Sequence, residues 1–240
     1  APDAPTVTDL ATNDTTPTLT GTAEADATVT VVVDGQTYTT TADADGNWSV
    51  DVTTVLTDGD YTVSVTATDA SGNTSDAGTG ALAIDTTAPD APTVTDLATN
   101  DTTPTLTGTA EANATITLVV DGQTYITNAD ATGTWSVDVT TGLTDGDYTV
   151  SVTATDASGN TSSAGTGDLA IDATAPIAPT VVDVTTNDTT PTLTGTAEAN
   201  ATVTVVVDGL TYITTANVNG TWNITTNVLP DGIYLVSVMA

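Results

Sequence analysis

The chain has 240 residues with no cysteine, histidine, lysine or arginine, and its 31 acidic residues give a formal charge of −31. Nucleic acid and anionic membrane surfaces are therefore poor partners, because both are held by Lys and Arg. Disulfides, catalytic triads and Schiff-base chemistry also lack their side chains, so we expect no enzyme.

Hydrophobicity is nevertheless high enough for a folded protein, with 38% apolar residues and a mean hydropathy of +0.07. Disorder requires high charge together with low hydrophobicity, and the second condition is not met. No apolar run reaches the roughly 18 residues of a membrane span, and no signal peptide opens the chain. Since Ala1 is not preceded by Met and the last repeat stops early, we interpret the chain as an internal piece of a longer protein.

A repeat of 87 residues organises the chain, as the spacing of Trp48, Trp135 and Trp222 shows. This period is long for solenoid repeats, which run roughly 20–50 residues, and suits a small domain repeated in tandem. It predicts three modules, hereafter modules 1 to 3, at residues 1–87, 88–174 and 175–240. The third module ends where one more strand is expected.

Module 1 alternates apolar and polar residues with a period of two, which predicts strands. The first hairpin is expected at Asp34-Gly35, and Trp48 is expected in the core. About seven short strands with turns every 8–12 residues predict an all-β, immunoglobulin-like antiparallel sandwich. The segment Leu56–Tyr61 resembles a tyrosine corner. The clearest strand segments are 16–23, 27–35, 36–43, 46–52, 60–69 and 78–87.

A proline-containing linker, Ala83–Val94, joins modules 1 and 2. Pro89 and Pro92 fix φ and favour an extended chain, so we expect tandem sandwiches arranged as an extended rod. For module 3 two explanations of the missing last strand stay open: the chain was cut there, or another copy supplies the strand.

Carboxylates are expected to gather at the junction of modules 1 and 2. In a sandwich, the loops that carry Glu111, Asp130 and Asp156 lie at the N-terminal end of module 2. Asp85 ends the last strand of module 1, and Asp90 lies on the linker. No cationic side chain balances them, and oxygen ligands suit Ca²⁺, whereas zinc prefers His or Cys. Mg²⁺ stays open as an alternative, although it usually keeps more of its water. We therefore predict a calcium site there.

Other acids have simpler interpretations. All three Glu residues recur in the phrase TAEA, and Glu24 could equally cap a turn. An Asx turn before proline accounts for Asp14, Asp101 and Asp188, and a turn before glycine accounts for Asp34, Asp121 and Asp208. For Asp58 and Asp60 both interpretations stay open.

The combination TPTLTGTAEADATVTVVVDGQTY, LTDGDYTVSVTATDASGNTS and IDTTAP resembles the bacterial immunoglobulin-like repeats of giant secreted surface adhesins and biofilm proteins. The resemblance covers all three modules. It implies an extracellular stalk on a bacterial cell surface whose tip ligand lies outside this chain. It also implies Ca²⁺ at or near the junctions. The implied ligands are Asp85, Glu111, Asp156, Asp172 and Glu198, with Glu24 and Asp69 at the matching places in module 1.

Three functions follow as hypotheses. The first is a structural extender whose partners are neighbouring modules of the same chain, stiffened by calcium. The second is a glycan- or ice-binding module that uses its Thr-rich strand faces, although exposed Thr is common on strands. The third is self-assembly into fibres with other copies through the open third module.

Overall fold

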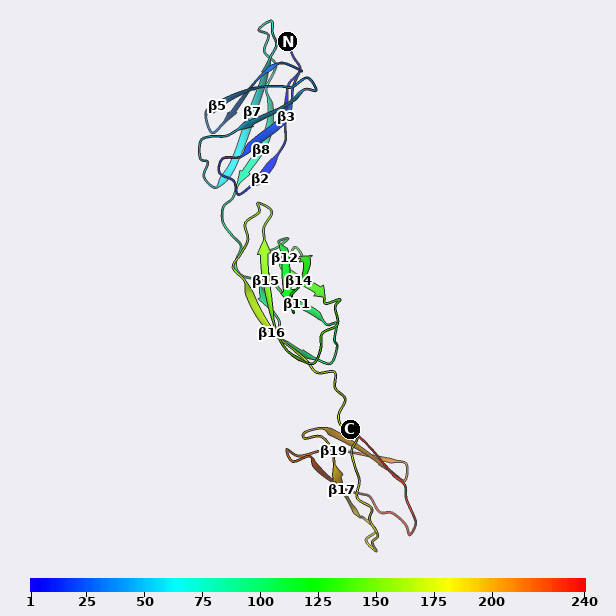
Figure 1. Ribbon diagram of the computed structural model, residues 1–240. Helices are drawn as coiled ribbons and strands as arrows, with labels where there is room; N and C mark the ends of the chain where they lie inside the picture. Colours follow the sequence, from blue (N-terminus) through cyan, green and yellow to red (C-terminus); the bar gives the residue numbers. More distant parts are fainter. The chain divides into compact units, whose positions relative to one another are not determined.

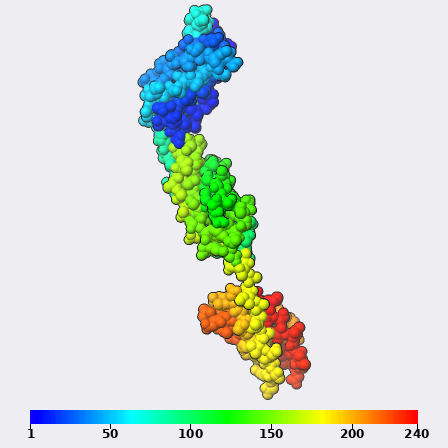
Figure 2. All heavy atoms as spheres, viewed as in Figure 1, coloured from blue at the N-terminus to red at the C-terminus, as the bar shows by residue number.

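The computed structural model describes residues 1–240, which form strands and loops throughout (Figure 1). The chain divides into two compact units, Ala1–Ala173 and Thr174–Ala240. The first unit holds modules 1 and 2, whose atoms meet in the space-filling view (Figure 2). No helix has the length and apolarity needed to cross a bilayer.

Module 1 is a sandwich of two sheets. One has the strand order β1-β3-β6 and the other the order β2-β8-β7-β4-β5. Its first sheet contains three strands, and the second places the last strand, β8, between β2 and β7. The strands are β1 (Thr6–Val7), β2 (Leu10–Thr12), β3 (Thr18–Thr22), β4 (Thr28–Val33), β5 (Gln36–Thr41), β6 (Asn47–Asp51), β7 (Gly59–Thr68) and β8 (Gly78–Ile84).

The period-two pattern accounts for the core. Val29, Val31 and Val33 of β4 are buried, and Trp48 of β6 packs against them with 3% of its surface exposed. β-Branched side chains fit a pleated surface with one buried face, which explains why this sequence forms strands. The turn after β4 has φ of 45° at Asp34 and 70° at Gly35. These values suit the type I′ turn that the sequence predicts.

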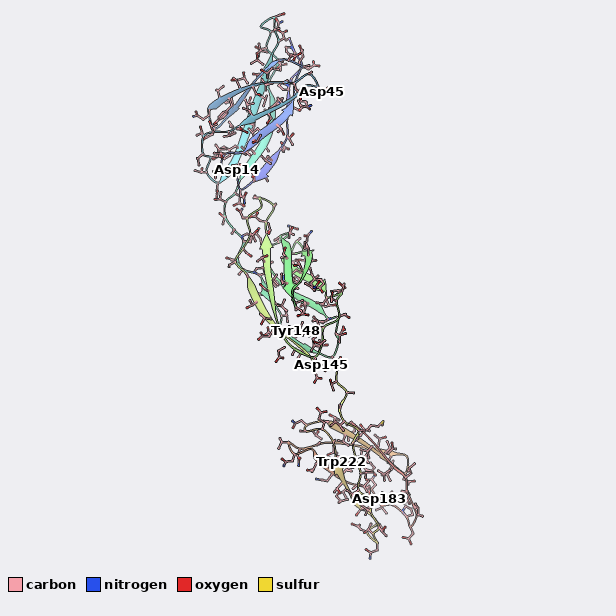
Figure 3. The ribbon with its side chains drawn as sticks, viewed as in Figure 1. Asp14, Asp45, Asp145, Tyr148, Asp183 and Trp222 are labelled. Atoms are coloured by element: carbon pink, nitrogen blue, oxygen red, sulfur yellow. The ribbon has the colours of Figure 1, made fainter.

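In each module a tyrosine hydroxyl donates a hydrogen bond to a main-chain oxygen four residues earlier: Tyr61 of β7, Tyr148 of β15 and Tyr234, which lies just before β21. The Tyr61 hydroxyl donates to the main-chain oxygen of Thr57 at 2.8 Å, and Tyr148 does the same to Thr144 at 2.8 Å (Figure 3). In module 3, Tyr234 donates to Pro230 at 2.8 Å. The predicted tyrosine corner is thereby confirmed in all three modules.

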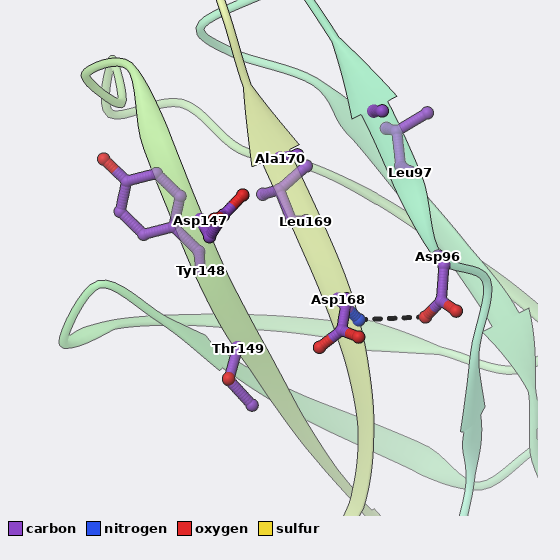
Figure 4. A pocket seen from close by; sticks show the side chains of 9 residues that line it. Asp96, Leu97, Asp147, Tyr148, Thr149, Asp168, Leu169 and Ala170 are labelled. Carbon is purple, nitrogen blue, oxygen red and sulfur yellow. Dashed lines mark hydrogen bonds between the residues drawn. The ribbon is translucent and has the colours of Figure 1, made fainter.

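The first strand of the sandwich is split, so that modules 1 and 2 have eight strands each and not about seven. β1 pairs antiparallel with β3 in one sheet, and β2 pairs parallel with β8 in the other. The carboxylate of Asp9 lies between them and accepts the Ala81 N–H at 2.7 Å. In module 2, Asp96 accepts the Asp168 N–H at 2.9 Å (Figure 4). Pieces of two and three residues are too short to show a period in the sequence.

The crossing of the split strand over the last strand requires glycine. A Cβ on Gly78 would overlap the main-chain oxygen of Pro5, and a Cβ on Gly80 would overlap Val7. Gly165 and Gly167 have the same relation to Pro92 and Val94 in module 2. The Gly-x-Gly sequence at the start of the last strand therefore makes room for the first strand of the same module.

Module 2 repeats this architecture with the sheets β14-β11-β9 and β10-β16-β15-β12-β13. Trp135 and Ile116 are buried in its core. Its strands are β9 (Thr93–Val94), β10 (Leu97–Thr99), β11 (Thr105–Thr109), β12 (Thr115–Val120), β13 (Gln123–Asn128), β14 (Thr134–Asp138), β15 (Gly146–Thr155) and β16 (Gly165–Ile171).

Module 3 has five strands in two smaller sheets, β17-β20 and β19-β18-β21. Trp222, Val203 and Val205 form its core. No strand follows β21, and residues 184–186, which match β10, lie outside the strands. The strands are β17 (Thr192–Thr196), β18 (Thr202–Val207), β19 (Leu210–Thr215), β20 (Thr221–Thr225) and β21 (Val236–Met239).

Candidate junction between modules 1 and 2

The loops of each module lie at its two ends, as expected for a sandwich of two sheets. Figure 3 places Asp14 and Asp45 at opposite ends of module 1. The loops are tied to their neighbours by main-chain hydrogen bonds: the Leu56 N–H donates to Thr15 at 2.9 Å. At the other end, the Ala23 N–H donates to Gly46 at 2.8 Å. The junction is therefore built from the far end of module 1 and the near end of module 2.

Two hydrogen bonds join the modules there. The Asn13 N–H, just after β2, donates to the main-chain oxygen of Ser158 at 2.9 Å. The side-chain amide of Asn160 donates to the main-chain oxygen of Asp85 at 2.7 Å and to Asp156 Oδ2 at 2.8 Å. The loop between β15 and β16 thus contacts both the end of β8 and the segment after β2.

The matching loop of module 1 shows how the loop is arranged when it does not contact another module of this chain. Asn73 donates to Asp69 Oδ2 at 2.7 Å, as Asn160 does to Asp156, but Asn73 is exposed. Asn160 is only 8% exposed. The hydrogen bond within the loop is the same, so the additional burial of Asn160 comes from its contact with module 1.

Asp156 organises this loop. Its Oδ1 accepts the N–H groups of Ser158 and Asn160, both at 2.9 Å. Burial raises the pKa of Asp156, but the hydrogen bonds from the Asn160 side chain and from the N–H groups of Asn160 and Ser158 outweigh it, so that the pKa lies below its ordinary value. The carboxylate is therefore a structural acceptor at neutral pH.

Asp130 is held in the same way on a neighbouring loop. Its Oδ1 accepts the Thr132 hydroxyl at 2.7 Å and the N–H groups of Thr132 and Thr134 at 2.8 and 2.9 Å. These bonds, led by the Thr132 hydroxyl, lower the pKa of Asp130. The Asn113 N–H donates to the main-chain oxygen of Asp130 at 3.2 Å, which connects this loop to the one that carries Glu111. Both Glu111 and Asp130 are exposed.

The structure contains no group of three or more Asp, Glu, His or Cys side chains placed to hold a metal ion. The expected convergence of four or five carboxylates is therefore not seen. Asn160 connects the main-chain oxygen of Asp85 to the carboxylate of Asp156, whereas Asp90 lies exposed on the linker. The remaining predicted ligands are half-buried Asp69 and exposed Glu24, Asp172 and Glu198. Their roles as ligands stay predictions.

Asp58, for which two interpretations were open, anchors the start of the linker. Its Oδ1 accepts the Thr86 N–H and hydroxyl at 3.0 and 2.8 Å, and its Oδ2 accepts the Thr87 hydroxyl at 3.2 Å. These bonds, led by the Thr86 hydroxyl, lower the pKa of Asp58. In module 2 Asp145 accepts the Ala173 N–H at 2.8 Å, close to Tyr148 (Figure 3).

The sequence-based prediction, which considered carboxylates, did not include the two asparagines that join the modules. Asn13 acts through its main chain and Asn160 through its amide, and neither type of group contributes to a charge count. The available signal was the phrase DASGN, whose Asp and Asn are four residues apart and suited to an Asx turn. The sequence placed this loop at the correct end of the module but did not identify the atoms in contact.

The chemistry of the junction suits an oxygen-preferring cation. Its acceptors are the Asp156 carboxylate and the main-chain oxygens of Asp85 and Ser158, without nitrogen or sulfur ligands, whereas the Asp85 carboxylate accepts the Thr87 N–H at 3.0 Å. Calcium takes 6–8 oxygen ligands from carboxylates, carbonyls and water, so this donor set fits it in kind.

Three of the solved structures similar to this chain come from bacterial adhesins and a biofilm-associated protein. One is a Ca²⁺-stabilised adhesin with which an Antarctic bacterium binds ice, at 29% identity over 98% of this chain and 72% of that one, with a TM-score of 0.38. Another is a 1.5-MDa bacterial ice-binding adhesin, at 27% identity over 92% and 85%, with a TM-score of 0.36. The third is the BSP domain of a biofilm-associated protein, at 25% identity over 72% and 30%, with a TM-score of 0.29.

The curated proteins gave no match. The sequence profile of one family, described as bacterial Ig-like domain, matches residues 4–86, 90–173 and 180–240. These three ranges include nearly the whole chain, and each lies within one of the three modules. The chain belongs to the bacterial Ig-like domain family.

Proposed function

We propose that this chain is an extender segment of a bacterial cell-surface adhesin, in which the modules act as spacers outside the cell. The observation that carries the proposal is the bond from Asn160 to Asp85, because it connects the end of one module to a loop of the next. The start of the linker is fixed by Asp58, whose carboxylate accepts three hydrogen bonds from Thr86 and Thr87. Such features suit domains joined end to end, and none of them resembles a catalytic site.

We further propose that Ca²⁺ binds at this junction and stiffens it. Asp156 and Asp85 are the first candidate ligands, with Asn160 donating to the carboxylate of Asp156 and to the main-chain oxygen of Asp85 as support, and Glu111, Asp130 and Asp90 are candidates from the adjoining loops and linker. Two carboxylates supply only part of a calcium shell, so carbonyl oxygens and water would complete it. A doubly charged ion would also reduce the repulsion in a chain of charge −31 that has no cationic side chains.

Small-angle scattering with millimolar calcium and with chelator, at matched ionic strength, tests the proposal. We expect a longer and stiffer particle with calcium. Metal bound only to the docked state stabilises it by about 4 kcal/mol at a thousandfold excess over Kd. Identical scattering profiles would exclude the stiffening role, although the modules could still act as spacers.

Calorimetry of one variant and its control tests the ligands. Glu111→Gln should weaken calcium binding, because Glu111 lies at an end of module 2 that meets another module. Glu24→Gln is the matched control at the same position of module 1, whose near end has no preceding module among residues 1–240. Equal calcium affinity in the wild type and in Glu111→Gln would remove Glu111 from the ligand set.

A further inference from the structure

Each module has a six-residue sheet edge without a carboxylate. The edge is β5 in module 1, β13 in module 2 and β19 in module 3, and each of these strands pairs with one neighbour only. Their sequences are QTYTTT, QTYITN and LTYITT. The other edges of modules 1 and 2 are two or three residues long or, in β6 and β14, end in an aspartate.

The main chain of this edge is free on one side. β13 follows β12 through a two-residue turn, so Val120 and Gln123 form the hydrogen-bonded pair that closes the hairpin. Hydrogen-bonded and non-hydrogen-bonded pairs alternate along an antiparallel ladder. The N–H and C=O groups of Thr124, Ile126 and Asn128 therefore point away from β12, and no strand of this chain pairs with them.

β13 lacks the features that usually keep a sheet edge from pairing. Its ladder with β12 runs over six residues without a bulge, and it contains no proline and no charged side chain. Its inner side is fixed, because the half-buried Tyr125 packs against the core and its hydroxyl accepts the Thr141 N–H at 3.4 Å. The edge is thus regular, neutral and held in place.

Modules 2 and 3 carry an apolar side chain in the middle of this edge. Ile126 and Ile213 are 68% and 69% exposed, and they match Thr39 of module 1. Val119 of β12 lies diagonal to Ile126 on the same face of the sheet and is 38% exposed. These side chains add nothing to the core of their own module, but a strand added beside β13 would cover them.

We propose that β13, with β19 as its equivalent in module 3, is the surface through which two copies of this chain associate. Each copy adds its edge strand antiparallel to that of the other. A two-fold axis at Ile126 pairs Ile126 with Ile126 and Thr124 with Asn128. All three outward-facing residues then exchange main-chain hydrogen bonds, and the two isoleucines cover each other. This inference depends neither on calcium nor on the role of the chain as a spacer.

Charge indicates which partner the edge fits. A basic partner is attracted to the carboxylates elsewhere on the chain and gains nothing from a neutral strand. A second copy, also with a charge of −31, can approach this strand without placing a carboxylate opposite it. The nearest acids along the chain lie beyond the strand ends, where the two-fold axis brings Asp121 of one copy toward Asp130 of the other. Association therefore strengthens as salt screens the repulsion.

Sedimentation velocity of the whole chain, with chelator, is the first test. The contact is smaller than most stable interfaces, so chain concentrations near millimolar are needed. NaCl is raised from about 0.01 to 1 M, over which the Debye length falls from roughly 30 to 3 Å. We expect a monomer at low salt and a growing fraction of dimer at high salt.

A double variant with a matched control locates the contact. Ile126→Asp combined with Ile213→Asp should weaken the dimer by about tenfold or more, because like charges then lie directly opposite each other. Thr107→Asp combined with Thr194→Asp adds the same two charges at exposed positions of the other sheet. The control should dimerise as the wild type does.

Cysteine cross-linking tests the register, because the chain has no cysteine of its own. Hydrogen-bonded residues of antiparallel strands have Cα atoms about 5.5 Å apart, which lies within the roughly 4.4–6.8 Å of a disulfide. Under oxidising conditions at high salt, Ile126→Cys should give a covalent dimer about tenfold faster than Thr107→Cys, since only the first pair of thiols is held together.

Three outcomes would overturn the proposal. One is a monomer at millimolar chain concentration and the highest salt. Another is equal dimerisation of the two double variants, because the edge strand would then not be the contact. The third is cross-linking at the same rate from residues 126 and 107, which would show that Ile126 does not face its counterpart.

Discussion

The side-chain amide of Asn160 donates to the main-chain oxygen of Asp85 at 2.7 Å and so connects module 2 to the last strand of module 1. The same amide donates to Asp156, which organises its own loop. A single residue therefore couples the conformation of a loop to the contact between two domains.

Asn160→Ala should loosen the junction. The change removes two hydrogen bonds and leaves the Asp85 oxygen without its donor, at a cost of about 1–2 kcal/mol. Small-angle scattering should show a broader distribution of particle dimensions. Asn73→Ala is the control, because it removes the same bond within a loop that faces no other module. Similar scattering from the two variants would contradict the role of Asn160 at the junction.

Acid should weaken the loop that makes this contact. The folded pKa of Asp156 lies below the ordinary value of 3.8, so its stabilising contribution is fully present above pH 3.8 and is lost as the pH falls through the folded pKa. Carboxyl NMR titration of Asp156 should give a midpoint below 3.8. A midpoint at or above that value would show that the hydrogen bonds of Ser158 and Asn160 do not stabilise the ionised form.

Gly165→Ala should destabilise module 2 by about 1–3 kcal/mol, because the new methyl overlaps the Pro92 oxygen. Chemical denaturation monitored by hydrogen exchange within β15 and β16 measures the effect. Gly142→Ala is the control, since a Cβ there meets nothing closer than the Thr102 hydroxyl at 4.0 Å. That variant should stay within about 0.5 kcal/mol of the wild type. Equal destabilisation would show that the strand crossing does not require glycine.

The fold could be predicted from local patterns because each pattern has a local cause. The alternation of Val29, Val31 and Val33 indicates a strand with one buried face, and Asp34-Gly35 indicates a turn with positive φ. The split of the first strand was not predicted, since it depends on Asp9 meeting Ala81, a residue 72 positions away. Patterns within one segment do not contain such a contact.

The candidate site was predicted less well, for a different physical reason. Net charge counts carboxylates but does not give the direction in which they point. Asp130 and Asp156 each accept N–H groups from residues two and four positions ahead, and Asp43 does the same. These carboxylates therefore accept hydrogen bonds within their own loops. Although the loops lie at the same end of a module, the carboxylates do not point toward one another.

The split first strand has a mechanical consequence. When a module is pulled by its two ends, force enters through β9, which precedes β10 and pairs with β11, and leaves at the C-terminal side of β16. Beyond β9 the load is carried between β10 and β16. Because these strands are parallel neighbours, with Leu97 opposite Leu169, the load slides one along the other and strains their hydrogen bonds together rather than one by one. Modules 1 and 2 each contain such a parallel pair, which acts as a shear clamp.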